Sequence, residues 1–168
     1  MDLVIRAAIH SDLDAVLAIE RASRTAAHWP RALYETAIGN NQRLFLIAER
    51  GDELVGFILA STAIQEWELE NIAVLPSVRR QRIGLALINA LISAAESAGA
   101  TEIRQEIRAS NLAAQRLGQL AGFIQNGRRP GYYRDPQEDA LLFKYLVPTA
   151  PEPQKEGSGS SGKAAKNR

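Results

Sequence analysis

One stretch of this sequence, residues 71–99, constrains the fold more than any other. It opens with Asn-Ile-Ala-Val-Leu, a run typical of a strand, and Pro76 ends that run. A short basic loop follows, and from Gly84 to Gly99 apolar residues recur at helical spacing. A strand that passes through a short loop into a helix points the free N–H groups of the first helical turn, and the positive end of the helix dipole, at one place. This stretch therefore predicts an anion-binding site at the start of the helix.

The loop contains three arginines, which favour a phosphate or a pyrophosphate as the anion. Neither of the two common nucleotide-binding loops occurs in it, because GxxxxGK followed by Ser or Thr is missing and so is GxGxxG. The spacing resembles instead the acyl-CoA loop of the GNAT superfamily of N-acetyltransferases, in which Gln or Arg is followed by x-x-Gly-x and then by Gly or Ala. Arg79 and Gly84 match the first and last positions of that motif, and Arg82 stands where the family has glycine.

The resemblance implies that this loop wraps the pyrophosphate of acetyl-CoA with its backbone N–H groups. An arginine at the glycine position either adds an ion pair or restricts how closely the main chain approaches the coenzyme. A solvated basic loop that only caps a helix is the alternative, and the matching strand and helix on either side favour the coenzyme. The acetyl-CoA-binding residues implied are Ile72, Val74, Arg79, Arg80, Gln81, Arg82, Ile83, Gly84, Leu85 and Asn111.

The rest of the chain alternates between strand and helix patterns. We expect strands at residues 3–7, 43–50, 53–64, 67–75, 102–108, 123–125 and 140–147, and helices at residues 11–24, 30–38, 84–99 and 111–122. Ser11 with Asp14 is the expected cap of the first helix, and residues 127–133 are expected to form a loop. This order predicts one α/β domain, an α+β arrangement in three layers. It is also the GNAT order, which implies a mixed, mainly antiparallel sheet with a splayed centre, flanked by about four helices.

Composition limits the domain organisation and the partners. The 168 residues, 46% of them hydrophobic, suffice for one packed domain, which we expect at residues 1–147. Residues 148–168 contain no large apolar side chain, so we expect a disordered tail there. A net charge of +1 gives no reason to expect nucleic-acid or membrane binding. No signal-peptide pattern and no membrane-spanning apolar run occurs, so we expect a soluble, cytoplasmic protein.

Residue types also limit the chemistry. The chain contains no cysteine, which excludes disulfides, thiolate nucleophiles and cysteine metal sites. His10 and His28 have no metal-ligand spacing with any carboxylate. We therefore expect no metal cofactor.

Within the GNAT superfamily, the second half of the chain resembles the bacterial ribosomal-protein-alanine N-acetyltransferases of the RimI type. The resemblance rests on Glu-Ile-Arg-Ala-Ser-Asn at residues 106–111, on Ala-Gly-Phe at 121–123, on Tyr-Tyr at 132–133 and on Glu-Asp-Ala at 138–140. The resemblance to the GNAT superfamily as a whole covers roughly residues 3–147, but the tyrosine that the family has in the helix at 111–122 falls on Gly118 here. The implied reaction is acetyl transfer from acetyl-CoA to the N-terminal alanine of a small-subunit ribosomal protein.

Direct attack of an amine on a thioester needs a neutral amine, a donor to the developing oxyanion and a proton for the leaving thiolate. At pH 7, about a tenth of a peptide α-amine with a pKa near 8 is neutral, whereas only about one lysine side chain in 2,000 is neutral. An N-terminal acceptor therefore needs little help from a general base to lose its proton. The resemblance places the base at Glu106, acting through a water, and the oxyanion donor at the N–H of Val74. Glu106 can also be a solvent-facing strand residue paired with Arg104 or Arg108. Glu68, where histone-type members keep their base, is the second candidate.

The resemblance also suggests an acceptor site, for which the candidates are Trp29, Tyr132, Tyr133 and Glu138. The two tyrosines are expected to wall a peptide groove. Trp29 lines this groove if it is exposed and fastens the first two helices together if it is buried. Asn111 contacts the coenzyme or caps the helix that it opens, and both roles stay open.

Two other functions remain open at this point. The chain could acetylate a small-molecule amine or a lysine, and Glu68 is the feature that supports this. It could also bind acyl-CoA without efficient turnover, because a glycine stands at the position of the family's acid and an arginine in the loop.

Overall fold

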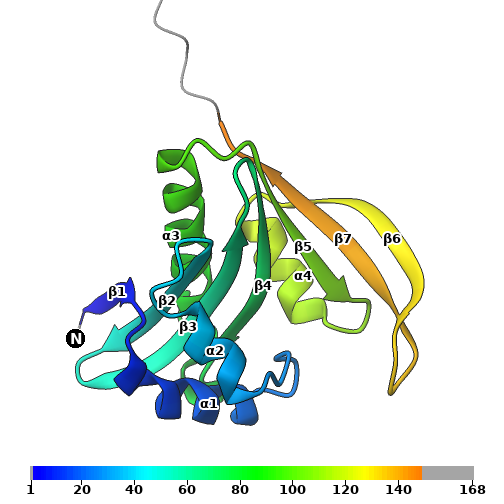
Figure 1. Ribbon diagram of the computed structural model, residues 1–168. Helices are drawn as coiled ribbons and strands as arrows, with labels where there is room; N and C mark the ends of the chain where they lie inside the picture. Colours follow the sequence, from blue (N-terminus) through cyan, green and yellow to red (C-terminus); the bar gives the residue numbers. More distant parts are fainter. Residues whose placement is uncertain (1, 149–168) are drawn as a thin grey trace, which may run out of the picture.

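The computed structural model describes residues 2–148, so the expected tail lies outside the described residues except for Pro148. In chain order the elements are β1 (Leu3–Ala7), a 3₁₀ turn η1 (His10–Asp12), α1 (Leu13–Ala22), α2 (Arg31–Ala37), β2 (Arg43–Arg50), β3 (Glu53–Thr62), β4 (Glu66–Val74), a 3₁₀ turn η2 (Pro76–Val78), α3 (Ile83–Ser97), β5 (Glu102–Arg108), α4 (Leu112–Leu120), β6 (Ile124–Tyr133) and β7 (Glu138–Leu146). This order of strands and helices confirms the predicted one (Figure 1).

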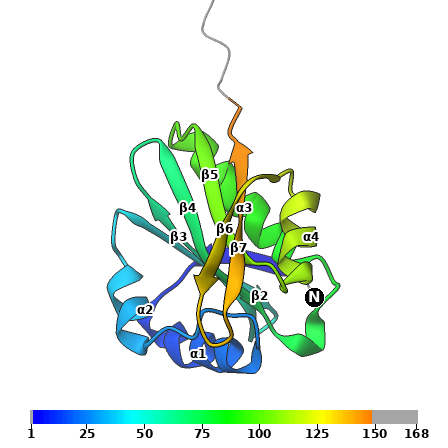
Figure 2. The same ribbon diagram turned by 90° about the vertical axis from the view of Figure 1, so that its right-hand side faces the viewer.

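The strands form one sheet in the order β1-β2-β3-β4-β5-β7-β6. Neighbouring strands within residues 2–148 are antiparallel, with β4 and β5 as the exception. The helices α3 and α4 cover one face of the sheet, and α1 and α2 cover part of the other face (Figures 1 and 2). The predicted three-layer, mainly antiparallel α/β fold is therefore confirmed.

Two hydrophobic cores lie on the two faces of the sheet. The α3 core is filled by apolar residues of α3 that recur at helical spacing. Its buried α3 members are Ile83, Leu87, Ile88, Leu91, Ile92 and Ala95. The α1–α2 core centres on Tyr34, whose ring centroid lies 5.7 Å from those of Phe45 and Phe57.

A bulge in β4 changes which face its side chains meet. The register between β3 and β4 shifts by one residue at Glu70. Before the bulge, Leu69 packs in the α3 core, whereas after it Asn71 is buried on the α1–α2 side. Val74 again contacts the α3 core. An extra residue in one strand of an antiparallel pair reverses the alternation in this way.

The centre of the sheet opens where β4 and β5 diverge. These parallel strands pair only from Glu66 to Leu69 on β4 and from Glu102 to Gln105 on β5. Beyond Leu69 and Gln105, β4 pairs only with β3, and β5 pairs only with β7. The divergence is visible in Figure 1, where α4 is seen between the two strands.

Residues 127–133 belong to β6, so the prediction of a loop there was wrong. Gly127 and Pro130 are typical of turns. However, β6 is the edge strand of the sheet, where a residue without an N–H donor is tolerated. Two register shifts against β7 accommodate the residues that do not pair. The other predicted bounds differ from the observed ones by two residues or fewer.

The predicted cap of the first helix, Ser11 with Asp14, was wrong, because no side chain within residues 2–148 caps α1. Asp12 lies at the N-cap position of α1, and its carboxylate accepts the N–H of Ile9 at 2.8 Å, at the start of η1, and two hydrogen bonds from Arg6 of β1. Asp12 therefore ties the start of the helix to the sheet. Among residues 2–148, no helix has both the length and the apolar character required to cross a bilayer.

Candidate active site

The loop between η2 and α3 presents free backbone donors. The first α-helical bond of α3 runs from the N–H of Ala86 to the carbonyl of Arg82 at 3.0 Å. The N–H groups of Ile83, Gly84 and Leu85 therefore come before the helical hydrogen-bond pattern, and no side chain of residues 2–148 caps them. Three adjacent N–H groups without a helical partner at a helix start can receive an anion, and the anion site that the sequence predicts here stays a prediction.

Arg82 holds the backbone in a conformation that favours glycine. Its φ is 62°, and Arg80 has a φ of 65°, both in the left-handed region. A side chain in this region costs about 1–2 kcal/mol compared with glycine, before the greater flexibility of unfolded glycine is counted. The left-handed backbone explains why glycine suits the position of Arg82 in this motif.

The three arginines of the loop have different surroundings. Arg79 donates from Nε to the carbonyl of Val74 at 3.3 Å and from Nη2 to Ser23 Oγ at 3.1 Å, so its guanidinium links the end of β4 to the end of α1. Arg80 and Arg82 are exposed and form no ion pair with any described residue. Gln81 accepts a hydrogen bond from Arg50. Arg80 and Arg82 are thus the loop cations available to an anion.

Gly84 permits a close contact between α3 and α4. A Cβ at this position would lie 3.0 Å from Leu117 Cδ2 and 3.8 Å from Val74 Cγ2. Gly84 is therefore needed for helix packing as well as for any approach of a ligand to the backbone.

The N–H of Val74 points into the gap between β4 and β5. Leu75 donates to the carbonyl of Val55 at 2.9 Å, and Val74 lies opposite Gly56. Hydrogen-bonded and non-hydrogen-bonded pairs alternate along antiparallel strands, so the N–H of Val74 faces away from β3, towards β5. β5 does not pair with β4 at this level, so the group has no strand partner within residues 2–148. The N–H of Ile72 faces the same way, two residues earlier.

Glu106 lies on β5 just beyond the point of divergence, on the sheet face opposite α3. Its Oε1 is 2.9 Å from Nη1 of Arg129, which reaches it from β6. The Arg129 guanidinium also lies over the ring of Tyr132, 5.3 Å from its centroid. One arginine therefore holds a carboxylate and an aromatic ring side by side.

The two tyrosines lie together near Glu106. Their ring centroids are 5.1 Å apart, edge to face, and Tyr132 is half exposed. Arg108 covers the Tyr133 ring at 4.3 Å. Burial, and then the charge of Glu106, raise the pKa of Tyr133, so its phenol stays protonated at neutral pH and can donate a hydrogen bond.

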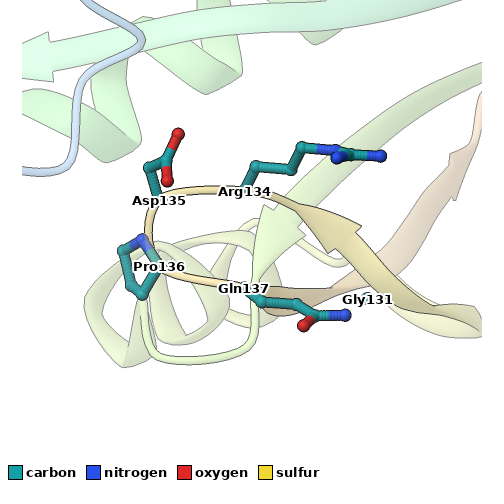
Figure 3. Close-up of a pocket in the computed structure, with 5 residues that line it drawn as sticks. All are labelled: Gly131, Arg134, Asp135, Pro136 and Gln137. Carbon is teal, nitrogen blue, oxygen red and sulfur yellow. The ribbon is translucent and has the colours of Figure 1, made fainter.

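The contacts of Glu138 connect β7 to the loop after β5 and to Arg108. Its carboxylate accepts the backbone N–H of Ser110 and pairs with Arg108 at 3.3 Å, and the contact with Ser110 lowers its pKa. Arg108 also donates to two carbonyls at the tip of the β6–β7 hairpin. A pocket at this tip is lined by Gly131, Arg134, Asp135, Pro136 and Gln137. Figure 3 shows that its polar side chains do not converge.

The remaining candidates are scattered. Glu68 is exposed opposite Arg104, on the same sheet face as Glu106 but before the strands diverge. Trp29 is half buried, with its ring centroid 5.9 Å from that of Tyr34, so it is neither fully exposed nor fully buried. Asn111 caps α4 by accepting the N–H of Ala114 at 3.1 Å. Within residues 2–148, no three potential ligands are grouped to hold a metal.

One buried cluster was not predicted from the sequence. Glu20 of α1 accepts hydrogen bonds from the Tyr34 hydroxyl, from the Asn71 amide at 3.1 Å and from the backbone N–H of Trp29 at 2.9 Å. Burial raises the pKa of Tyr34, so this residue is a hydroxyl donor. The cluster anchors the loop between α1 and α2 to β4, beside the gap. A glutamate among apolar helix positions was the only signal for it.

Comparison with known proteins gives a consistent result. Residues 13–123 match the model of the acetyltransferase (GNAT) family. The ribosomal protein bS18-alanine N-acetyltransferase of Escherichia coli K12 is 33% identical over 135 residues, which cover 79% of this chain and 90% of that protein. The crystal structure of the ribosomal-protein-S18-alanine N-acetyltransferase from E. coli superimposes with a TM-score of 0.79 at 29% identity, covering 90% of this chain and 97% of that one. Ard1 from Thermoplasma volcanium gives 0.78 at 26% identity, covering 88% and 99%.

Proposed function

This chain belongs to the GNAT family and is an N-acetyltransferase, and from that premise we propose that it transfers the acetyl group of acetyl-CoA to the N-terminal alanine of a small-subunit ribosomal protein. The relatives named for alanine acetylation of bS18 support that protein as the acceptor. The observation that carries the chemistry is the divergence of β4 and β5, with the free N–H of Val74 on one strand and Glu106 on the other.

The coenzyme binds at the start of α3. The N–H groups of Ile83, Gly84 and Leu85 receive the pyrophosphate, and the helix dipole adds to the attraction. Arg80 and Arg82 supply positive charge, because their guanidinium groups form no ion pair within residues 2–148. The pantetheine arm then runs into the gap, along the edge of β4 where the N–H groups of Ile72 and Val74 have no strand partner within residues 2–148.

The amine attacks the thioester carbonyl carbon directly. The N–H of Val74 donates to the carbonyl oxygen as negative charge develops on it. The C–S bond breaks, and its electron pair leaves on sulfur as a thiolate. Glu106 accepts, through a water, the proton that the amine loses. A thiol with a pKa of about 8.5 is a good leaving group at neutral pH, so the missing helix tyrosine is not essential.

The acceptor peptide lies against Tyr132 and Tyr133. These rings adjoin Glu106 through Arg129, so a peptide that packs on them brings its N-terminus to the base. Glu138 supports this surface by holding the hairpin in place through Ser110 and Arg108.

The test is an acetylation assay with acetyl-CoA and two matched peptides. One has the N-terminal sequence of bS18 from the same organism with a free alanine, and the other has its N-terminus blocked and carries one lysine. The neutral fractions of the two amines at pH 7 differ by about 200-fold, so we expect at least a hundredfold preference for the free N-terminus. Comparable rates on both peptides would assign the chain to lysine or small-molecule acetylation instead.

A further inference from the structure

A buried side chain without a partner lies where β4 and β5 separate. Gln105 is only 7% exposed, yet its Oε1 has no hydrogen-bond partner within residues 2–148. It is the one buried side-chain oxygen or nitrogen in this condition among the described residues. Leaving a buried acceptor unpaired is unfavourable, and native structures normally satisfy such groups. The Oε1 atom of Gln105 is therefore available to a ligand.

The position of Gln105 specifies where that ligand lies. Gln105 pairs with Leu69 as the last β4–β5 pair before the divergence. Its side chain lies on the face of β5 that also carries Ile103 and Ile107, which is the face covered by α3 and α4. The carboxamide is thus at the inner end of the gap, on the opposite side of the sheet from Glu106.

Gly118 places no side chain against this carboxamide. It is a buried residue in the interior of α4, where glycine is about 1 kcal/mol less favourable than alanine. A Cβ at Gly118 would lie 3.7 Å from Gln105 Oε1 and 3.7 Å from Phe123 Cβ, which are ordinary contacts. Packing does not require a glycine here, but a larger side chain would cover the amide.

We propose that Gln105 binds the sulfur end of the coenzyme and stabilises it as the leaving group. This inference rests on the proposed function, because it requires acyl-CoA in the gap. When the C–S bond breaks, its electron pair stays on sulfur, and the Nε2–H of Gln105 donates to that thiolate. When the sulfur takes up a proton from water, Oε1 accepts the resulting S–H. A carboxamide can serve both forms, because it carries a donor and an acceptor.

The thioester sulfur of acetyl-CoA has neither a charge nor a hydrogen. Gln105 therefore favours the product, free CoA, over acetyl-CoA, and this preference separates a ligand contact from a structural role. Binding of each coenzyme to the full chain, without acceptor, is measured by calorimetry for the parent and for Gln105→Leu. We expect free CoA to bind Gln105→Leu about 3- to 10-fold more weakly and acetyl-CoA to change by less than about twofold.

Melting temperature supplies a second measurement. Gln105→Leu removes an unpaired polar group, so its melting temperature without ligand should equal or exceed that of the parent. Gln119→Leu, the same exchange on the exposed side of α4, is the matched control and should bind both coenzymes as the parent does.

The outcomes separate this inference from the proposed function. Three outcomes would overturn the role of Gln105 but leave the proposed function standing. They are unchanged CoA binding by Gln105→Leu, an equal loss of affinity for both coenzymes, and a lower melting temperature. A parent protein that binds neither coenzyme would overturn the proposed function itself.

Discussion

Arg129 of β6 reaches across β7 to Glu106 of β5, with Nη1 2.9 Å from Oε1. The same guanidinium lies over Tyr132, so the proposed base and the proposed acceptor surface are joined by one side chain. Ala140 of β7 is the residue opposite Arg129, and Leu142 is the one opposite Glu106. Pairing in the sheet therefore fixes the geometry of the site.

Glu106→Gln tests the base directly. The amide keeps the size of the side chain and can still contact Arg129, but it cannot take up a proton. We expect kcat/KM for the free-alanine peptide at pH 7 to fall about 10- to 100-fold. This loss does not exceed the low end of the usual contribution of a general base, because part of the amine is already neutral at pH 7 and needs no base. Glu66→Gln, an exposed change on β4, should retain the parental rate.

Glu68→Gln is the competing variant. If it abolishes activity while Glu106→Gln is silent, the base is Glu68 and the acceptor becomes a lysine or a small amine. Both carboxylates lie on the same face of the sheet, so the acceptor can approach either one, and only the kinetics separate them.

Arg80→Gln should weaken acetyl-CoA binding without affecting stability. Arg80 is exposed and forms no ion pair within residues 2–148, so its charge is free for the pyrophosphate. A charge-assisted hydrogen bond contributes about 1.5–3 kcal/mol when it is well ordered, and an exposed arginine less, so we expect a rise in Kd of about 3- to 10-fold. The effect should shrink as salt is added. Calorimetry at two ionic strengths measures both, and a loss that does not depend on salt would contradict the charge interpretation.

Arg82→Gly should stabilise the protein. The substitution relieves a left-handed backbone with a φ of 62°, and part of this gain is offset by the greater flexibility of glycine in the unfolded chain. We expect the free energy of unfolding in urea to rise by about 0.5 kcal/mol or more. Gln81→Gly is the matched control, because Gln81 is not among the residues with positive φ, and it should stay level or lose stability. A gain in both variants would show that the backbone of Arg82 is not the cause.

Periodicity in the sequence predicted most of the fold. The strand predicted at residues 102–108 is confirmed as β5, and its burial pattern places Gln105 and Glu106 on opposite faces. The expected start of α3 near Gly84 is also confirmed. These features depend on neighbours within one element, so a single sequence contains them.

Other features depend on contacts between distant residues and could not be predicted. The strand at 127–133 contains glycine and proline, and its pairing with β7 brings it into the sheet. The ion pair of Glu106 with Arg129 requires the strand order β5-β7-β6, which no local pattern reveals. The contact between Asn71 and Glu20 arises because the bulge at Glu70 turns Asn71 towards α1.

The last prediction concerns pH and the start of α1. Asp12 is 8% exposed and binds the Arg6 guanidinium with both oxygens, at 2.8 and 3.0 Å, and the hydrogen bond from Arg6 is the main cause that lowers its pKa. A carboxyl group with a lowered pKa in the folded state adds stability that is complete above its unfolded pKa, about 3.9, and is lost as the pH falls through the folded value. We therefore expect Asp12→Asn to lose about 1–3 kcal/mol at pH 7.

That loss should shrink as the pH falls below about 4, because the parent then becomes protonated at Asp12 and resembles the variant. Urea unfolding at pH 7, 5 and 3 measures the difference. Asp14→Asn is the matched control: Asp14 pairs with Arg31 at 2.6 Å, but its side chain is 88% exposed, so we expect a change below about 0.5 kcal/mol at every pH. Should the Asp12→Asn deficit persist undiminished at pH 3, the contribution of Asp12 would come from the shape and hydrogen bonding of the helix start and not from its charge.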